Sequence, residues 1–182
     1  MFIFLDNGVS VGYNVYKSDT VEVIMNLYIK QRVFSFGDKF HVYGEDGEEK
    51  YYVEGEVFSF GKKLHLFDID GNRLADINQR LFSFLPRYYV TTCENRTFEI
   101  IKHFTFIRQL YEVNPFGWVV EGDFFAHSYV ISNGEENIVE VEKQWFSFGD
   151  AYRIHIKDGV DVISALSTVL VIDACLDQNN NN

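Results

Sequence analysis

The 182-residue sequence is short of proline, cysteine and positive charge. Only two prolines and two cysteines occur, and the cysteines, Cys93 and Cys175, are too few for a disulfide framework in a chain of this length. Sixteen Lys and Arg against 27 Asp and Glu give a formal net charge of −11. Nucleic acids and anionic membranes both attract positive surfaces. The charge therefore argues against a nucleic-acid partner and predicts weak or absent binding to anionic membranes.

Long apolar runs are also missing. The apolar start at 1–5 ends at Asp6 and has no basic residue before it, so it lacks the pattern of a signal peptide. The stretch 160–176 is shorter than the roughly 20 residues that cross a bilayer, and it contains Asp161 and Asp173. These absences predict a cytoplasmic protein with reduced thiols and without a transmembrane segment.

Motifs for metals and phosphates are absent as well. The sequence has no His-x-His, His-Glu-x-x-His or Cys-x-x-Cys spacing and no glycine-rich phosphate loop. Residues 68–72 begin like a calcium loop, but the sixth and twelfth positions hold Arg73 and Gln79 where glycine and glutamate are required. We therefore interpret 68–72 as a hairpin turn and expect neither a metal nor a cofactor.

Candidate catalytic side chains are few. Cys93 has no histidine beside it in sequence, although His103 remains a partner that the fold would have to bring close. His41 and His65 occupy matching positions in successive repeats, which indicates solvated positions on an outer face, with approach across the barrel wall as the alternative. His127 is the histidine whose burial is most informative for a possible functional role. We predict no catalytic residue, and an enzyme using Cys93 or a histidine is the weakest alternative.

Aromatic residues are plentiful, with 18 Phe, 11 Tyr and 2 Trp, and many of them belong to an internal repeat. Phe-Ser-Phe occurs at 34–36, 58–60, 82–84 and 146–148, with a Phe-Thr-Phe variant at 104–106. Each copy precedes a tight turn, and a short alternating segment and a second turn follow. Asp-Gly or Asn-Gly marks this second turn at 46–47, 70–71 and 133–134.

The repeat unit predicts a long strand followed by a short one, and about twelve antiparallel strands in total. We place them at 25–36, 39–45, 50–60, 63–69, 73–84, 87–93, 96–106, 109–114, 117–124, 127–133, 137–148 and 151–157. Because side chains alternate along a strand, the motif phenylalanines are expected to point inward and the serines and histidines outward. Ile154 and Ile156 are likewise expected inside, with Arg153 and His155 outside.

The segment near 161–176 has a different pattern, because it is apolar on every side of a helix and has Asp161 at its start. Such a helix must be buried all round, and about 16 residues span roughly 24 Å. A twelve-stranded barrel is wider than its own side chains fill. We predict a mainly β fold, a closed barrel around this C-terminal helix, with Cys175 as inert packing. The rows of Phe34, Phe58, Phe82 and Phe146 are expected to enclose Leu166, Val169, Leu170 and Ile172.

Several segments resemble bacterial members of the LURP-one-related family: LYIKQRVFSFGDK at 27–39, DINQRLFSFLP at 76–86, WVVEGDF at 118–124 and KQWFSFGD at 143–150. The resemblance covers about residues 25–176. It implies a tubby-like fold, a twelve-stranded barrel around a central hydrophobic helix, shared with tubby proteins and phospholipid scramblases. It implies no established reaction. Tubby proteins bind phosphoinositide head groups through basic residues, and no equivalent cluster can be placed here. Scramblases add cysteine-rich and membrane-anchoring segments that this sequence lacks.

The domain organisation follows from these patterns. Residues 25–176 form a single tubby-like domain, and the Asn-rich tail at 177–182 is expected to be disordered. Residues 1–24 lie outside the resemblance and represent either an extra strand pair around Asn7-Gly8 or a start assigned too early. The sequence thus favours a non-catalytic cytosolic binding or scaffold module with a small lipid or protein partner. The alternative is a lipid- or fatty-acid-binding, membrane-associated protein.

Overall fold

The computed structural model describes residues 24–30, 39–56, 59–104, 109–146 and 149–180. Across these residues the chain forms twelve strands and one helix. They are β1 (Met25–Lys30), β2 (Lys39–Gly44), β3 (Glu49–Gly55), β4 (Lys63–Asp68), β5 (Arg73–Gln79), β6 (Arg87–Thr92), β7 (Thr97–Phe104), β8 (Gln109–Asn114), β9 (Trp118–Asp123), β10 (Ser128–Ser132), β11 (Asn137–Phe146), β12 (Gly149–Ile156) and α1 (Val162–Asn180).

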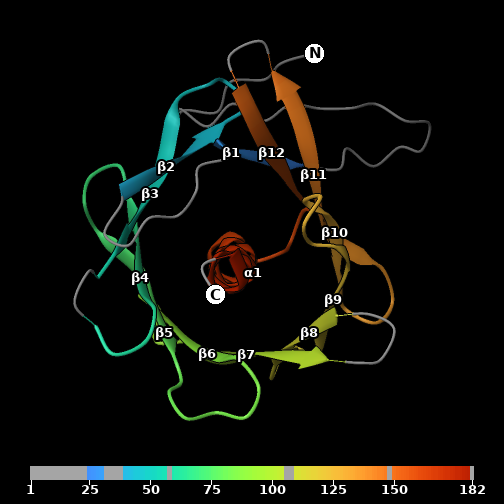
Figure 1. Cartoon of the computed structure of the whole chain (residues 1–182). Helices are drawn as coiled ribbons and strands as arrows, with labels where there is room; N and C mark the ends of the chain where they lie inside the picture. Colours follow the sequence, from blue (N-terminus) through green and yellow to red (C-terminus); the bar gives the residue numbers. More distant parts are fainter. Residues whose placement is uncertain (1–23, 31–38, 57–58, 105–108, 147–148, 181–182) are drawn as a thin grey trace.

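The strands close into a barrel because each one pairs with its neighbours in sequence and β1 pairs with β12. The closing pair is antiparallel, with Leu27 opposite Ile154 and Ile29 opposite Tyr152. Figure 1 looks along the barrel and shows α1 in its centre, surrounded by the strands. The predicted closed antiparallel barrel around a C-terminal helix is confirmed.

The core lies between the strands and α1. Alternate residues of the strands point inward, and Ile154 and Ile156 are among them, as predicted. Every residue of α1 from Ser164 to Leu176 is buried. The helix begins as expected, since the Ser164 backbone N–H donates to Asp161 Oδ1 at 2.8 Å and Asp161 thereby caps it. The inner wall is built from aliphatic side chains and tyrosines, including Val42, Leu66, Ile77, Val90, Ile100, Tyr111, Val113 and Ile131.

The predicted inward position of the repeat phenylalanines is wrong wherever the structure describes them. β3 and β5 end at Gly55 and Gln79, five residues before the ends of their motifs, and Phe60, Phe82 and Phe84 lie exposed in the following turns. Gly61 (φ 82°) and Phe82 (φ 56°) adopt left-handed backbone conformations, so the strand alternation does not continue through the motifs. Phe34 and Phe58 lie outside the described residues, and nothing is described of the Phe146 side chain.

The end of the chain also differs from the prediction. α1 continues to Asn180, so the prediction of a disordered tail is wrong for residues 177–180. No proline or glycine occurs after Gly159, and the first asparagine, the other residue that commonly follows a helix, comes only at position 179. The proposed extension at 1–24 lies outside the described residues except for its last position, and both interpretations of it stay predictions.

The hairpin turns follow their dipeptides. Gly47, Gly71 and Gly134 all have positive φ, as the Asp-Gly and Asn-Gly sequences predict. In the 68–72 turn, Asp68 Oδ1 accepts the backbone N–H groups of Asp70 and Asn72 at 3.0 and 2.8 Å. The hydrogen bond from the Asn72 side chain, with these backbone bonds, lowers the pKa of the Asp68 carboxyl. The stretch is the predicted hairpin, closed by its own side chains.

Candidate binding surface at one end of the barrel

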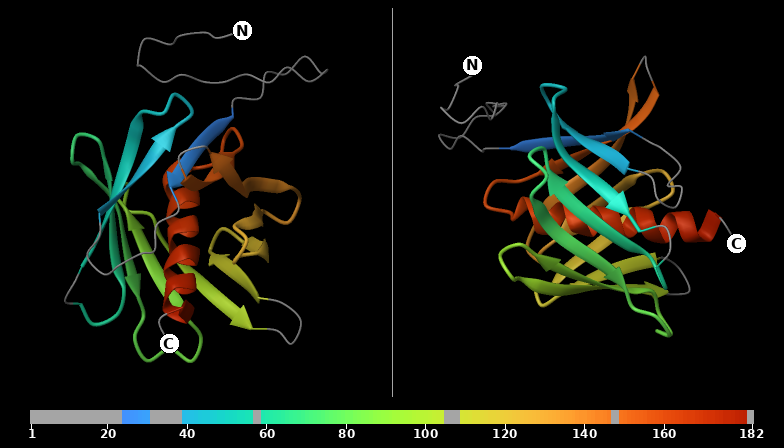
Figure 2. Two further views of the ribbon diagram at one scale, coloured as in Figure 1. Left: turned by 45° about the horizontal axis from the view of Figure 1, so that its top comes forward. Right: turned by 90° about the vertical axis from the view of Figure 1, so that its left-hand side faces the viewer.

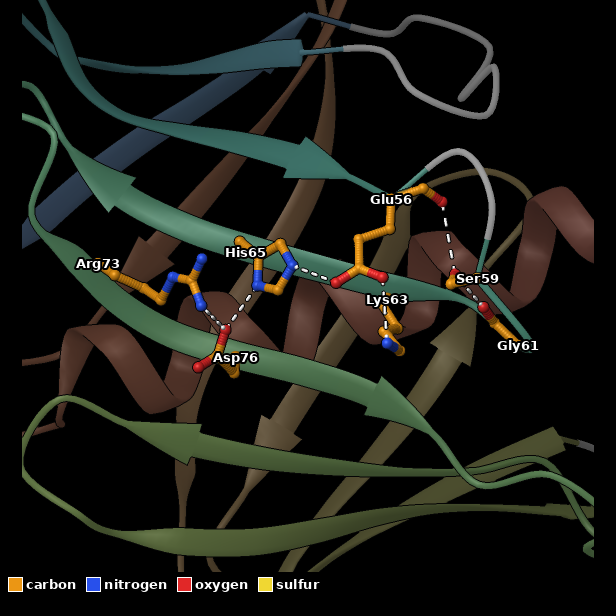
Figure 3. Close-up of polar contacts among 7 residues, drawn as sticks. All are labelled: Glu56, Ser59, Gly61, Lys63, His65, Arg73 and Asp76. Atoms are coloured by element: carbon orange, nitrogen blue, oxygen red, sulfur yellow. Dashed lines mark hydrogen bonds and ion pairs between the residues drawn. The ribbon is translucent and has the colours of Figure 1, made fainter.

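His65 is the centre of a polar network on the outer face of β4 (Figure 3). Its Nδ1 lies 2.5 Å from Asp76 Oδ1, and its Nε2 lies 3.0 Å from Glu56 Oε1. Lys63 and Arg73 neutralise the two carboxylates from either side, at 3.1 Å each. The two ring nitrogens of His65 point in opposite directions, and each contacts a different carboxylate. The three side chains therefore do not surround one position where a metal ion could bind. The network is a chain of ion pairs that joins β4 to its neighbours.

The same network contains no catalytic triad. Ser59 Oγ, at its edge in Figure 3, donates to the Gly61 carbonyl at 2.7 Å, while His65 is occupied by carboxylates on both nitrogens. His41 pairs with Glu49 at 2.7 Å, and β3 separates its strand from that of His65. The structure therefore does not bring His41 and His65 together. Among the described residues no group of three or more His, Cys, Asp or Glu is arranged to hold a metal.

The two cysteines have no catalytic surroundings. Cys93 is exposed in the turn between β6 and β7, whereas His103 lies near the other end of β7, roughly 20 Å along the strand. His103 pairs instead with Glu112 at 3.2 Å. Cys175 is buried against the barrel wall, and burial raises the pKa of its thiol to about 11. A thiol with that pKa is not a thiolate at neutral pH and does not act as a nucleophile.

A buried polar cluster fixes α1 inside the barrel. The Tyr152 hydroxyl donates to Asp173 Oδ2, and the ring of His127 stacks on that of Tyr152 with 4.6 Å between centroids and 4° between planes. His127 Nδ1 lies 3.8 Å from Asp173 Oδ1, and burial lowers the pKa of this histidine. The structure thus leaves His127, the histidine whose burial was in question, half-buried, with 12% of its side chain exposed. Because α1 is apolar on nearly every side, the polar contacts of Asp173 help to fix the rotation of the helix about its own axis inside the barrel.

Two lysines also reach the helix from the barrel wall. Lys62 Nζ donates to the Ala174 carbonyl at 3.3 Å. Lys102 is buried with its ammonium 5.7 Å from the centroid of the Tyr111 ring, and burial lowers the pKa of Lys102. Both positive charges lie near the C-terminal half of α1, where the helix dipole favours them. The sequence could have predicted the inward position of Lys102. Side chains alternate along a strand, and Lys102 is an even-numbered residue of β7 like the buried Phe98 and Ile100.

The Tyr152 to Asp173 hydrogen bond gives a testable prediction. Tyr152→Phe removes only the hydroxyl and leaves a buried carboxylate without that donor, so we expect a loss of about 1–3 kcal/mol in the free energy of unfolding. Urea denaturation measures it. Tyr89→Phe is the matched control, because Tyr89 is exposed and accepts only from exposed Arg80, at 3.2 Å. Equal effects of the two substitutions would show that the cluster does not hold the helix.

Exposed aromatic side chains gather at one end of the barrel. Odd-numbered strands all run toward this end, so the turns after β3, β5 and β9 and the end of β7 lie there together. The C-terminal end of α1 emerges at the same end (Figure 2). Phe82 and Phe84 are fully exposed, Phe60 is 91% exposed, and Phe104 and Phe125 are 58% and 61% exposed. We call these residues, together with Leu81, the aromatic rim.

The aromatic rim stands out from the rest of the surface. Among the described residues, eight large hydrophobic side chains are exposed, and six of them belong to the rim. The others are Ile69, in a turn at the opposite end, and Tyr89 on β6. Single exposed apolar residues are ordinary, but the concentration of six of these eight at one end of the barrel singles out that end as a candidate interaction surface. The rim is therefore the part of the described surface best suited to binding a partner.

Charge is also divided between the two ends. The turns at the opposite end (45–48, 69–72, 93–96, 115–117, 133–136 and 157–161) hold nine acidic residues and two basic ones. The acidic residues are Glu45, Asp46, Glu48, Asp70, Glu94, Glu135, Glu136, Asp158 and Asp161, and the basic ones are Arg96 and Lys157. The described turn residues at the rim (56, 59–62, 80–86 and 124–127) hold only Glu56, Lys62 and Arg80 as charged residues. Among the described turns, acidic residues are thus concentrated at the end opposite the rim.

Comparisons with known proteins agree with the fold. In the described part of the chain no helix is both long and apolar enough to cross a membrane. The chain is 34% identical over 153 residues to YxjI, an uncharacterized protein of Bacillus subtilis (strain 168), which covers 84% of this chain and 94% of that protein. It also resembles the X-ray structure of an Arabidopsis thaliana protein, with a TM-score of 0.61 and 15% identity over 85% of this chain and 91% of that one. That likeness shows the tubby-like fold.

The sequence profile of the LURP-one-related family matches residues 25–173, which span all twelve strands of the barrel and most of α1. Neither this family nor the Bacillus relative is known for an enzymatic activity. The match, the barrel and the central helix lead to the same assignment. This chain belongs to the LURP-one-related family.

Proposed function

We propose that the protein is a non-catalytic binding module that contacts its partner through the aromatic rim. The observation that carries the proposal is the set of exposed phenylalanines on turns at one end of a rigid barrel. Exposed phenylalanine is costly for solubility and contributes nothing to the core, so its concentration at one end favours a role in binding. The closed barrel around α1 supplies a scaffold on which these turns hold fixed relative positions.

Two other readings of the fold have less support. A fatty acid enclosed in the barrel needs space in the lumen, and α1 occupies the centre with every side chain from Ser164 to Leu176 buried. An enzyme of the kind considered needs a nucleophile beside a base. Cys93 is exposed in a turn far from His103, Cys175 is buried in the core, and His103 pairs with the carboxylate of Glu112 instead of with a cysteine. Binding by the outer surface therefore remains the function that the geometry supports best.

Paired variants test the role of the aromatic rim. Phe82→Asn combined with Phe84→Asn removes two fully exposed rings, and asparagine tolerates the left-handed backbone of position 82. Ile69→Asn is the matched control, because Ile69 is 63% exposed in a turn at the opposite end. Surface changes of this kind alter stability by only about 0.5 kcal/mol, so both variants are expected to melt like the wild type.

The measurement compares what the immobilised variants retain from membrane and soluble fractions of the source cells. We expect the wild type and Ile69→Asn to retain the same proteins or lipids and the double rim variant to lose most of them. Equal retention by all three proteins would place the binding surface elsewhere and contradict the proposal.

A further inference from the structure

We propose that the partner of the aromatic rim is the surface of a phospholipid bilayer, into which the rim phenylalanines insert. This inference rests on the proposed binding role of the rim and adds the chemistry of its partner. It places the barrel upright on the lipid surface, with the rim down and the acidic hairpin turns in water.

The spacing of the phenylalanines favours a lipid phase over a shaped protein pocket. They come from four separate places around the barrel: the turn after β3 (Phe60), the turn after β5 (Phe82 and Phe84), the end of β7 (Phe104) and the turn after β9 (Phe125). A protein partner would need a separate pocket for each side chain. The interfacial region of a bilayer is planar and fluid and accepts all of them at once, because apolar side chains partition into it independently of shape.

Polar groups beside the rim suit a shallow position in the head-group region. Arg80 directly precedes Leu81 and Phe82 and is exposed, so its long side chain can reach phosphate groups while the neighbouring rings insert. Lys63 lies at the same end on β4, paired with Glu56 at 3.1 Å. The acidic residues that would repel a membrane are mostly elsewhere, in the turns of the opposite end.

The net charge of −11 predicts weak binding to anionic membranes if the charge is spread evenly. The acidic turns, however, lie at the end of the barrel opposite the rim. α1 alone has 19 residues, and a helix of that length extends about 28 Å. The Debye length at physiological ionic strength is only about 8 Å. The acidic turns at the far end are therefore screened from a surface that touches the rim. Close to the rim, the described turns carry Arg80 and Glu56 at the surface, while Lys62 is buried against Ala174, so these turn charges nearly cancel.

Flotation of the full chain with lipid vesicles tests the inference. The probes are vesicles of phosphatidylcholine alone and vesicles in which part of it is replaced by phosphatidylglycerol. We expect the wild type and Ile69→Asn to float with both, with a few-fold higher partition on phosphatidylglycerol at low salt. The double variant Phe82→Asn, Phe84→Asn is expected to partition at least about tenfold less, since two inserting rings are lost.

A second measurement tests the orientation. Phe84→Trp places a fluorophore in the rim, and Ile69→Trp places one at the opposite end. Brominated lipids quench tryptophan only at short range, so we expect vesicle-dependent quenching for Phe84→Trp and none for Ile69→Trp. Equal quenching at both positions would contradict the upright placement.

The outcomes separate this inference from the proposed function. If the wild type does not float but the rim variant still loses a retained protein, the rim binds a protein and the lipid inference is wrong. If the wild type is a dimer in solution and the rim variant is a monomer that floats equally well, the rim joins two copies of the chain and the lipid inference is again wrong. If neither flotation nor retention depends on Phe82 and Phe84, both proposals fail.

Discussion

Leu170→Asp is expected to abolish soluble folded protein, whereas Leu170→Ala leaves a folded barrel with a clearly lower melting temperature. Leu170 is completely buried at the centre of the barrel, among aliphatic and aromatic side chains of the strands. Truncation of a leucine in such a core costs about 2–5 kcal/mol in the free energy of unfolding. A carboxylate there loses its hydration without gaining a partner, which costs more than the whole stability of a typical domain supplies.

Soluble yield and thermal melts of the two variants measure these effects. Val162→Asp is the matched control, because Val162 is half-buried in the first turn of α1, where the helix dipole favours a negative charge. We expect it to melt close to the wild type. A stable Leu170→Asp protein would mean that α1 leaves the barrel without loss of the fold, and the helix would then be an interaction element instead of a core element.

The architecture was predictable because its signals are local and repeated. Asp46-Gly47, Asp70-Gly71 and Asn133-Gly134 each specify a tight turn from two residues, and together with the turns that follow the Phe-Ser-Phe copies they set the number of strands. The segment around Leu170 shows by its composition alone that it must be buried on all sides. A closed barrel with a helix inside accounts for both the many tight turns and the helix that must be buried. Each of these two features can be recognised from a short stretch of sequence, without knowing which distant residues are in contact.

The positions of the repeat phenylalanines were not predictable from alternation. Phe-Ser-Phe has the same alternating pattern in a strand and in a turn, and periodicity cannot tell where a strand ends. The signals that end the strands were weaker, namely Gly61 after one motif and Pro86 after another. Phe82 adopts a positive φ, which is rare for a bulky residue, so propensity gave the opposite expectation.

The candidate site was hidden for a different reason. Its residues are far apart in sequence and meet only because all odd-numbered strands run in the same direction. Net charge is an average over the chain and does not report that Glu45, Glu94 and Glu135 lie at one end while Arg80 lies at the other. The Tyr152, His127 and Asp173 cluster likewise draws on β12, on the turn after β9 and on α1. Such features depend on tertiary structure, and single-sequence patterns do not contain them.

Gly122→Ala is expected to destabilise the barrel by at least about 3 kcal/mol, which is the upper range for a strained backbone position in a folded domain. Gly122 lies in β9 with φ 145°, a conformation that residues with a Cβ rarely adopt. A Cβ there would lie 2.5 Å from the Ser128 carbonyl oxygen and 2.5 Å from Tyr129 Cα. Both atoms belong to the backbone of the paired strand β10, so no side-chain rotation relieves the clash.

Gly117→Ala is the control that separates strain from contact. Gly117 also has a positive φ, 69°, but a Cβ there meets nothing within 4 Å. It is therefore expected to cost only about 1–2 kcal/mol, from the left-handed backbone alone. Urea denaturation of both variants gives the difference. Similar losses would show that β9 and β10 separate easily at Gly122. In that case the turn that follows, with Phe125 in the aromatic rim and His127 against Tyr152, is not held in place by the close approach of these two strands.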